Sequence, residues 1–220
     1  METLTEENYL KTIFKLSLNN SNLVGTNAIA DEMSTKSASV TDMVKRLALK
    51  KLVFYTPYKG VKLTDKGRKK AVDVVRKHRL WEVFLVDTLK FKWDEVHHIA
   101  EELEHVNSKE LFNRLDKFLG YPKFDPHGDP IPDAKGKLSS MEMKPLADLG
   151  LKDKGVICGV LDDSKTFLQY LEKVKLKLGN KVSLVEKHQF DNSIDVKINN
   201  RTSVHISNKI ARNILVSSNK

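Results

Sequence analysis

Two amphipathic segments near the N-terminus, joined by a short polar turn, narrow the choice of fold more than any other part of the chain. The first covers residues 27–33, the turn covers 34–36, and the second segment begins near Ser37. Apolar residues of the second segment recur with the i, i+3, i+4, i+7 spacing of one helix face. These residues are Val40, Met43, Val44 and Leu47. The pattern is typical of a helix-turn-helix, with Thr26 as the predicted N-cap of the first helix and Ser37 or Ser39 as that of the second.

The flanking segments complete a winged helix. An amphipathic stretch over 4–18 precedes the pair, and two β-prone stretches, 52–55 and 61–64, follow it with the turn-forming residues 56–60 between them. Residues 1–77 contain 15 Lys and Arg against 8 Asp and Glu, a net charge of +7 in a chain whose total is +9. Because a polyanion is attracted to such a surface, this basic winged helix favours binding to double-stranded DNA.

The expected DNA contacts follow from this geometry. The N-terminal end of the second helix reaches base edges in the major groove, where small hydrogen-bonding side chains fit. Basic side chains farther along that helix and in the hairpin suit phosphates. The candidate DNA-binding residues are Thr26, Ser37, Ala38, Ser39, Thr41, Lys45, Arg46, Lys59 and Lys62.

The middle of the chain concentrates histidines and carboxylates. Residues 78–123 hold 7 Lys and Arg against 9 Asp and Glu, a net charge of −2, and four of the seven histidines fall within the first part of this stretch. Two His–Glu pairs have i, i+4 spacing, one on a helix predicted over 76–89 and one on a helix predicted over 94–118. The candidate metal ligands are His78, Glu82, His97, Glu101, Glu104 and His105. The last three are expected on one side of the second helix, and such a donor set suits Mn(II), Fe(II), Co(II) or Zn(II).

Toward the C-terminus the pattern changes to short β-prone stretches. Strands are predicted over 156–161, 182–185, 194–198 and 203–206, and a helix is predicted over 164–174. A small β-rich module fits this alternation. The fold class expected for the whole chain is therefore mainly α with a small β part.

The sequence resembles the diphtheria-toxin-repressor family of metal-dependent transcriptional regulators, which includes iron-dependent repressors and manganese transport regulators. The resemblance covers nearly the whole chain. Its most specific motifs are Tyr9-Leu10-Lys11-Thr12-Ile13, Lys77-His78-Arg79-Leu80 with Glu82, Glu104-His105-Val106, and Pro126-His127-Gly128-Asp129-Pro130-Ile131-Pro132. It implies a winged-helix DNA-binding domain over 1–73, a helical dimerisation and metal-binding domain over 74–124, a linker over 125–145, and an SH3-like (FeoA-like) small barrel over 146–220.

The resemblance also divides the candidate ligands between two metal sites. One site is matched by His78, Glu82 and His97, and the other by Asn8, Glu101, Glu104 and His105. Asp163, in the C-terminal domain, is a further candidate for the first site. Iron-type relatives have a cysteine at the position of Glu101, so a carboxylate there favours Mn(II). Fe(II) is the alternative, and Zn(II) or Co(II) are expected to substitute in vitro.

Two residues depart from the manganese-type pattern. Asn8 stands where relatives have Asp or Met, and its neutral amide oxygen is a weaker ligand than a carboxylate. Lys11 stands where manganese-type relatives have Glu, and its ammonium would repel a metal if it pointed inward. The retained trio of His78, Glu82 and His97 is closer to the iron-type layout, so the resemblance is to a mixture of the two patterns.

The predicted function is that of a homodimeric, metal-dependent repressor of metal-uptake genes. No apolar run approaches the roughly 18 to 20 residues of a membrane span, and the acidic N-terminus lacks a signal-peptide pattern, so a cytoplasmic protein without a membrane partner is expected. A single cysteine, Cys158, excludes an internal disulfide and a thiolate-cluster zinc site. The chain contains no evident strand-to-helix nucleophile or phosphate loop, so neither an enzyme nor a small-molecule substrate is expected.

Two alternatives remain open from the sequence. Clusters of His and Glu on helices also build metalloenzyme sites. A winged-helix regulator that ignores metal is the other alternative, with the His and Glu side chains serving as ion pairs at a dimer interface.

Overall fold

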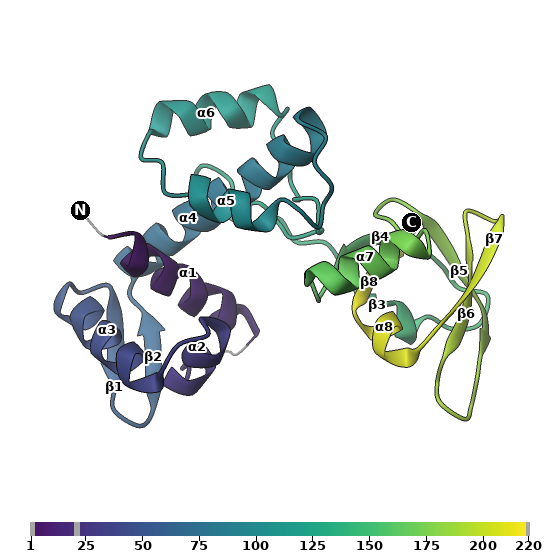
Figure 1. The fold of residues 1–220 in the computed structure, drawn as a ribbon, viewed down its shortest axis with the longest axis horizontal. Coiled ribbons are helices and arrows are strands. Elements are labelled where there is room, and N and C mark those ends of the chain that lie inside the picture. Colours follow the sequence, from purple (N-terminus) through teal and green to yellow (C-terminus); the bar gives the residue numbers. More distant parts are fainter. Residues whose placement is uncertain (1–2, 20–22, 219–220) are drawn as a thin grey trace. The chain divides into compact units, whose positions relative to one another are not determined.

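The computed structural model of the chain describes residues 3–19 and 23–218, which form two compact units (Figure 1). Of these residues, the first unit contains 3–19, 23–78, 101–112 and 132–137. The second contains 79–100, 113–131 and 138–218.

The N-terminal part of the first unit is a helix-turn-helix followed by a β-hairpin. Its elements are α1 (Leu4–Asn19), α2 (Thr26–Glu32), α3 (Ser37–Leu49), β1 (Val53–Thr56), β2 (Gly60–Leu63) and α4 (Asp65–Val83). The hairpin is antiparallel, with Val53 opposite Leu63. The apolar faces that the sequence predicts for the helices of this part pack together into its core. Leu10, Phe14 and Leu47, for example, are fully buried. The predicted winged helix is confirmed.

The starts of α2 and α3 differ from the prediction. α2 begins with Thr26 itself and α3 begins with Ser37 itself, so neither residue is an N-cap. The caps are Gly25 and Lys36, and neither helix has a side-chain cap hydrogen bond. The cap predictions at Thr26, Ser37 and Ser39 are therefore wrong. The Ser37 hydroxyl instead donates a hydrogen bond of 3.0 Å to Asn27 Oδ1, and so links α3 to α2.

The helical middle of the chain is more interrupted than predicted. α4 passes into a π-helical turn (Phe84–Thr88), and two short helices follow, α5 (His97–Leu103) and α6 (Lys109–Phe118). The single helix predicted over 94–118 is wrong, because Glu104 and His105 lie in the turn after α5. A local reason is Ser108, whose hydroxyl oxygen accepts a hydrogen bond from the backbone N–H three residues on, at 3.3 Å, and starts α6 anew.

The C-terminal part of the second unit is an antiparallel sheet with strand order β3-β8-β4-β5-β6-β7. Its strands are β3 (Lys144–Pro145), β4 (Lys154–Val160), β5 (Lys181–Lys187), β6 (Ile194–Ile198), β7 (Thr202–Ile206) and β8 (Ile214–Ser218). A 3₁₀ turn (Leu146–Asp148) and the helices α7 (Lys165–Lys173) and α8 (Asn208–Arg212) accompany them. The expected β-rich domain is confirmed, but within the described residues the sheet ends at β3 and β7 and does not close into a barrel.

The segment that carries the Pro-His-Gly-Asp motif packs directly against β4. Val160 donates a backbone hydrogen bond to the His127 carbonyl at 2.9 Å. Gly128 adopts a φ of +91°, and a Cβ there would lie 2.1 Å from the Cys158 carbonyl oxygen, so only glycine fits. This contact fixes the backbone on which His127 stands.

Among the described helices, none combines the length and the apolar character that crossing a membrane would require.

Candidate metal centres

The first candidate centre lies around Glu104, a fully buried carboxylate in the turn after α5. Lys11 Nζ lies 2.6 Å from Glu104 Oε1, and His78 Nδ1 lies 2.5 Å from Glu104 Oε2. Burial opposes the charged carboxylate, but the hydrogen bond from His78 and the charge of Lys11 lower the pKa of Glu104 below its usual range. Glu104 is therefore an anion that already has an ammonium partner in Lys11 and a hydrogen-bond donor in His78.

Three more side chains extend this group. His105 Nε2 lies 3.6 Å from Glu104 Oε1, and its Nδ1 lies 2.6 Å from Glu7 Oε2 on α1. Lys11 Nζ also lies 3.4 Å from Glu101 Oε1. We refer to these side chains together with Asn8 as the Glu104 cluster. Its residues are Glu7, Asn8, Lys11, His78, Glu101, Glu104 and His105.

α1 also contributes a polar atom that suits a cation. The side-chain oxygen of Asn8 is buried, and it has no hydrogen-bond partner among the described residues. A buried acceptor without a donor costs about 1 to 3 kcal/mol, so such a group is usually satisfied by a water, an ion or a ligand. Asn8 stands on α1 between Glu7, which contacts His105, and Lys11, which contacts Glu104. The orphaned oxygen therefore fits the ligand role expected for Asn8.

His78 connects this cluster with the second candidate centre. An ionised carboxylate only accepts hydrogen bonds, so the contact with Glu104 places the hydrogen of the imidazole on Nδ1. The Nε2 atom then carries the lone pair that can bind a metal. A carboxylate that orients a histidine in this way is a common outer-shell partner of metal sites.

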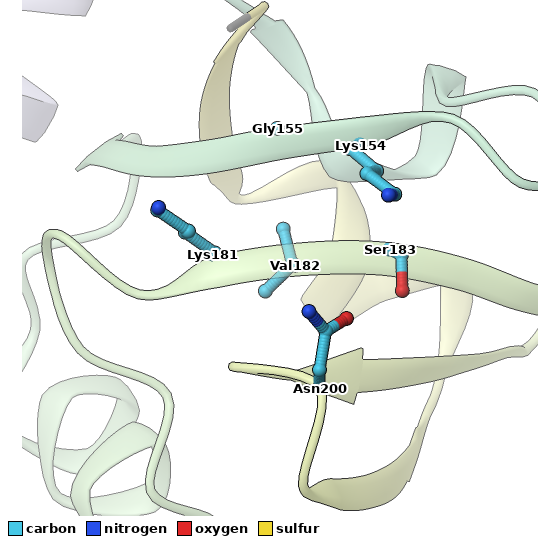
Figure 2. Close-up of a pocket in the computed structure, with 6 residues that line it drawn as sticks. All are labelled: Lys154, Gly155, Lys181, Val182, Ser183 and Asn200. Carbon is cyan, nitrogen blue, oxygen red and sulfur yellow. The ribbon is translucent and has the colours of Figure 1, made fainter.

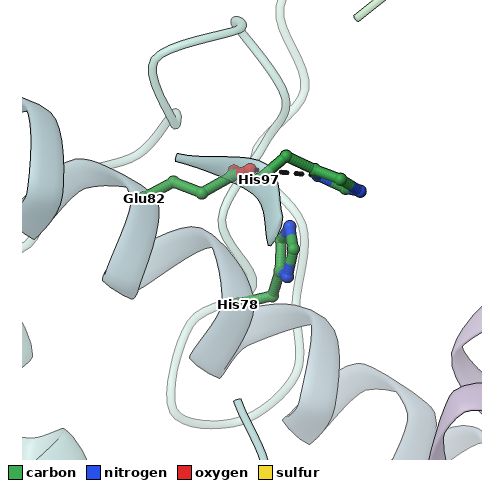
Figure 3. Close-up of side chains that lie close together, drawn as sticks. All are labelled: His78, Glu82 and His97. Carbon is green, nitrogen blue, oxygen red and sulfur yellow. Dashed lines mark hydrogen bonds and ion pairs between the residues drawn. The ribbon is translucent and has the colours of Figure 1, made fainter. Parts of the chain in front are cut away.

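The second centre is built on Glu82, one helical turn after His78 on α4 (Figure 3). His97 Nδ1 lies 3.4 Å from Glu82 Oε1, as Figure 3 shows by the dashed line. One potential ligand atom from each of His78, Glu82 and His97 lies within 4.8 Å of the others. The i, i+4 spacing and the start of α5 thus bring together three residues that the sequence suggested.

A further pair that the sequence analysis did not assign joins Glu82. Asp125 and His127 are buried, and together with Glu82 they form another group whose ligand atoms lie within 4.8 Å. We refer to His78, Glu82, His97, Asp125 and His127 as the Glu82 cluster. The available signal was the Pro-His-Gly-Asp motif itself, but nothing in its spacing indicates that it approaches α4.

The two ring nitrogens of His127 face different partners. Its Nε2 lies 2.9 Å from the Trp93 carbonyl oxygen, to which it donates, and Nδ1 faces Glu82 at 3.7 Å. Burial alone disfavours the imidazolium, but the neighbouring Glu82 and Asp125 raise the pKa of His127 to about 9.

Burial, together with the charges of Glu82 and Asp129, raises the pKa of Asp125 to about 7. Arg79 Nε lies 3.5 Å from Asp125 Oδ2, so Arg79 and His127 already face the carboxylates of this cluster.

Asp163 is placed differently from the other candidate ligands. It is exposed, and it belongs to none of the groups of three or more His, Cys, Asp and Glu that come together within residues 3–19 and 23–218. Its role as a ligand finds no support in its surroundings.

The candidate DNA-binding residues divide by exposure. Thr26 and Thr41 are partly buried, and the Thr41 hydroxyl donates to the Ser37 carbonyl at 2.9 Å. The exposed candidates are Ser37, Ala38, Ser39, Lys45, Arg46, Lys59 and Lys62. Arg46 lies 3.8 Å from the buried Glu6 carboxylate, whose nearer partner is Lys50 at 2.8 Å. This ion pair between α1 and α3 holds the exposed face of α3 in position.

A shallow hollow on the C-terminal sheet, drawn in Figure 2, has a different character. It is lined by Lys154, Gly155, Lys181, Val182, Ser183 and Asn200. None of these lining residues is a carboxylate or an imidazole, so the hollow offers no metal site.

Three protein families match consecutive parts of the chain. The iron dependent repressor N-terminal DNA binding domain matches residues 1–61, the iron dependent repressor metal binding and dimerisation domain matches 64–133, and the FeoA domain matches 144–218. The Glu104 and Glu82 clusters take their residues from the first two of these segments. The chemistry of their donors therefore agrees with the description of the second family.

Relatives with curated descriptions include repressors of the same family. The diphtheria toxin repressor of Corynebacterium efficiens is 30% identical over 217 residues, which cover 96% of this chain and 86% of that protein. The iron-dependent repressor IdeR of Mycobacterium tuberculosis is 38% identical over 128 residues, 58% of this chain and 55% of its own length. A Chlamydia trachomatis protein described as a probable metal transport system membrane protein is 53% identical over 70 residues, 32% of this chain and 16% of that protein. The chain therefore spans about half of the mycobacterial relative and a small part of the chlamydial one.

Solved structures extend the comparison over the whole chain. A manganese-dependent transcriptional repressor in complex with manganese has a TM-score of 0.87 and 33% identity, covering 97% of this chain and 100% of that chain. An IdeR of T. acidophilum has a TM-score of 0.75 and 26% identity, with complete coverage of both chains. Relatives of the manganese type and of the iron type are thus both similar to this chain, so similarity leaves the metal unresolved.

Proposed function

Because the chain belongs to the diphtheria-toxin-repressor family of metal-dependent transcriptional repressors, we propose that it represses metal-uptake genes as a cytoplasmic homodimer that binds operator DNA when Mn(II) is bound. The observation that carries the proposal is the Glu104 cluster. In it, side chains of α1, within the DNA-binding segment, contact Glu104 and His105, within the metal-binding segment.

The donors present fit divalent metals of this kind. Asn8, Glu101, Glu104 and His105 would hold one ion, and the Glu82 cluster would hold another, with Asp125 and His127 added to the ligands expected from the sequence. A bound ion would supply two positive charges that draw carboxylate, amide and imidazole donors together. The donor set contains no sulfur ligand, so it favours Mn(II), with Fe(II) as the alternative.

The chain's own residues supply the coupling to DNA. Asn8 and Glu7 stand on α1, so ordering of the Glu104 cluster fixes α1 against the turn that carries Glu104 and His105. α1 in turn holds α3 through the Glu6 ion pairs with Lys50 and Arg46. In a homodimer, two ordered α3 helices can face half-sites in successive major grooves. By linkage, whatever factor metal adds to DNA affinity, DNA adds to metal affinity.

One observation favours a second candidate function. Lys11 already pairs with Glu104, and His78 donates a hydrogen bond to it, without any metal. A regulator in which this cluster serves only as a buried ion pair, and binds DNA regardless of metal, is therefore the competing function. The family's descriptions give the metalloenzyme alternative no support.

Separate substitutions distinguish DNA contact from metal binding. Ser39→Ala is expected to weaken operator binding about fivefold, as for the loss of one hydrogen bond of about 1 kcal/mol, and Lys45→Ala is expected to lower the salt slope of binding by about one. Both should leave Mn(II) affinity unchanged. Fluorescence anisotropy at several salt concentrations measures the operator affinity and its salt slope. Ser140→Ala, which replaces an exposed serine outside the basic domain, is the matched control. Loss of metal binding in Ser39→Ala would show that α3 is misassigned.

A further inference from the structure

A third group of potential ligands lies on the C-terminal sheet and shares no residue with the two clusters described above. His188 Nε2 lies 3.0 Å from Asp195 Oδ2, and His205 Nδ1 lies 2.9 Å from Asp195 Oδ1. The two imidazole rings meet edge to face with centroids 5.2 Å apart. One ligand atom from each residue lies within 4.8 Å of the others.

The backbone around this group is fixed by strand pairing. Asp195 on β6 stands directly opposite His205 on β7. His188 follows the last residue of β5, and its N–H donates to the Ser193 carbonyl at 2.9 Å, just before β6 begins. The sheet register therefore fixes Asp195 and His205, and a backbone hydrogen bond to Ser193 holds His188 beside them.

The spacing of the donor atoms suits a metal ion. Ligands at the tetrahedral angle around an ion with bonds of about 2.1 Å are separated by about 3.4 Å, so the three side chains need to move only slightly to bind one. The two N–O distances in this group are 3.0 and 2.9 Å. The side chains are also partly exposed, 36% for His188, 30% for Asp195 and 59% for His205, so water can complete the coordination.

We propose that His188, Asp195 and His205 form a third divalent-metal site, which takes Zn(II), Ni(II) or Cu(II) in preference to Mn(II). Two imidazoles and one carboxylate with open positions bind the later first-row metals more tightly than Mn(II). The site goes beyond the proposed regulatory function, since it shares no ligand with the Glu104 and Glu82 clusters. Without metal, hydrogen bonds join the same three groups, and those from His188 and His205 lower the pKa of Asp195.

The test compares zinc and manganese stoichiometry in the full chain. The double variant His188→Gln/His205→Gln is dialysed against micromolar Zn(II) or against Mn(II), and bound metal is counted per chain. Loss of one zinc per chain with an unchanged manganese count is expected. An unchanged zinc count would overturn the site, and a parallel fall in manganese would show that the group is not a separate site.

Two controls keep the result interpretable. His98→Gln removes an exposed histidine that belongs to none of the candidate groups in the described residues, and it should keep the full zinc count. If the double variant does not fold by circular dichroism, the single variant His205→Gln, at the most exposed of the three positions, should lower zinc affinity at this site about tenfold or more. Retained zinc affinity in that variant would equally overturn the site. Mn(II)-activated DNA binding, measured in the same variants, should stay within twofold of the unsubstituted chain, so failure of the regulatory proposal is seen separately.

Discussion

Glu104→Gln is expected to lower Mn(II) affinity about 100-fold or more and to remove metal-activated operator binding, since losing even an outer-shell partner costs about 10- to 100-fold. The substitution keeps the shape of the side chain but removes its charge. Glu104 is fully buried and contacts both Lys11 and His78, so no neighbouring water or side chain can replace the lost carboxylate oxygen easily. His105→Ala is expected to act in the same direction, because it removes a ligand that also contacts Glu7.

Competition with a fluorescent chelator measures the metal affinity of Glu104→Gln, and anisotropy measures its DNA affinity. Glu102→Gln is the matched control, because Glu102 is an exposed carboxylate only two residues before Glu104, at the end of α5. It should leave both affinities unchanged. Full metal activation in Glu104→Gln would mean that the Glu104 cluster is an ion pair without a regulatory role.

The second large effect is expected for Lys11→Met, which should make the chain less stable in chelator but a better metal binder. The Lys11 side chain is 6% exposed and lies 2.6 Å from Glu104, so its removal leaves a buried carboxylate without its ammonium partner. Breaking a buried pair in this way costs about 3 to 5 kcal/mol. The same ammonium competes with a metal for the Glu104 and Glu101 oxygens, so Mn(II) affinity should rise about tenfold or more.

Denaturant unfolding in chelator and in saturating Mn(II) tests both halves of this expectation. In Lys11→Met, Mn(II) should restore most of the stability lost in chelator, because the ion supplies the missing positive charge. Lys15→Met, one helical turn farther along α1, is the control and should show neither effect. Weaker Mn(II) binding by Lys11→Met would mean that Lys11 supports the metal site instead of competing with it.

Local pattern was sufficient for the helix-turn-helix and the hairpin. The stripe that buries Val40, Val44 and Leu47 follows from helix periodicity alone, so tertiary context adds little to the assignment. Helix ends were less predictable. Ser37 carries a cap-forming hydroxyl, but this hydroxyl donates to α2, and such competition between partners is not visible in the sequence.

The candidate metal centres likewise combine ligands that local sequence predicts with ligands that only tertiary contacts bring together. The i, i+4 spacing of His78 and Glu82 on α4 is a local signal, and both residues lie in one group of potential ligands. Asp125 and His127 join Glu82 because their segment packs on β4 through Gly128 and returns to α4. Such a contact depends on the path of the chain in space. Likewise, the inward direction of Lys11 is a packing outcome, since a lysine on an amphipathic helix more often extends its ammonium into water.

The most direct test of metal-dependent repression is an anisotropy titration of the chain onto promoter DNA of a metal-importer gene at one fixed salt concentration. It is run in chelator, with Mn(II), with Fe(II) under anaerobic conditions, and with Zn(II). Binding that tightens about tenfold or more on adding metal, most strongly with Mn(II), is the predicted result, within the range of ordinary allosteric coupling. Equal affinity in chelator and in every metal would contradict it, and would leave a winged-helix DNA-binding protein whose buried His and Glu residues serve only as ion pairs.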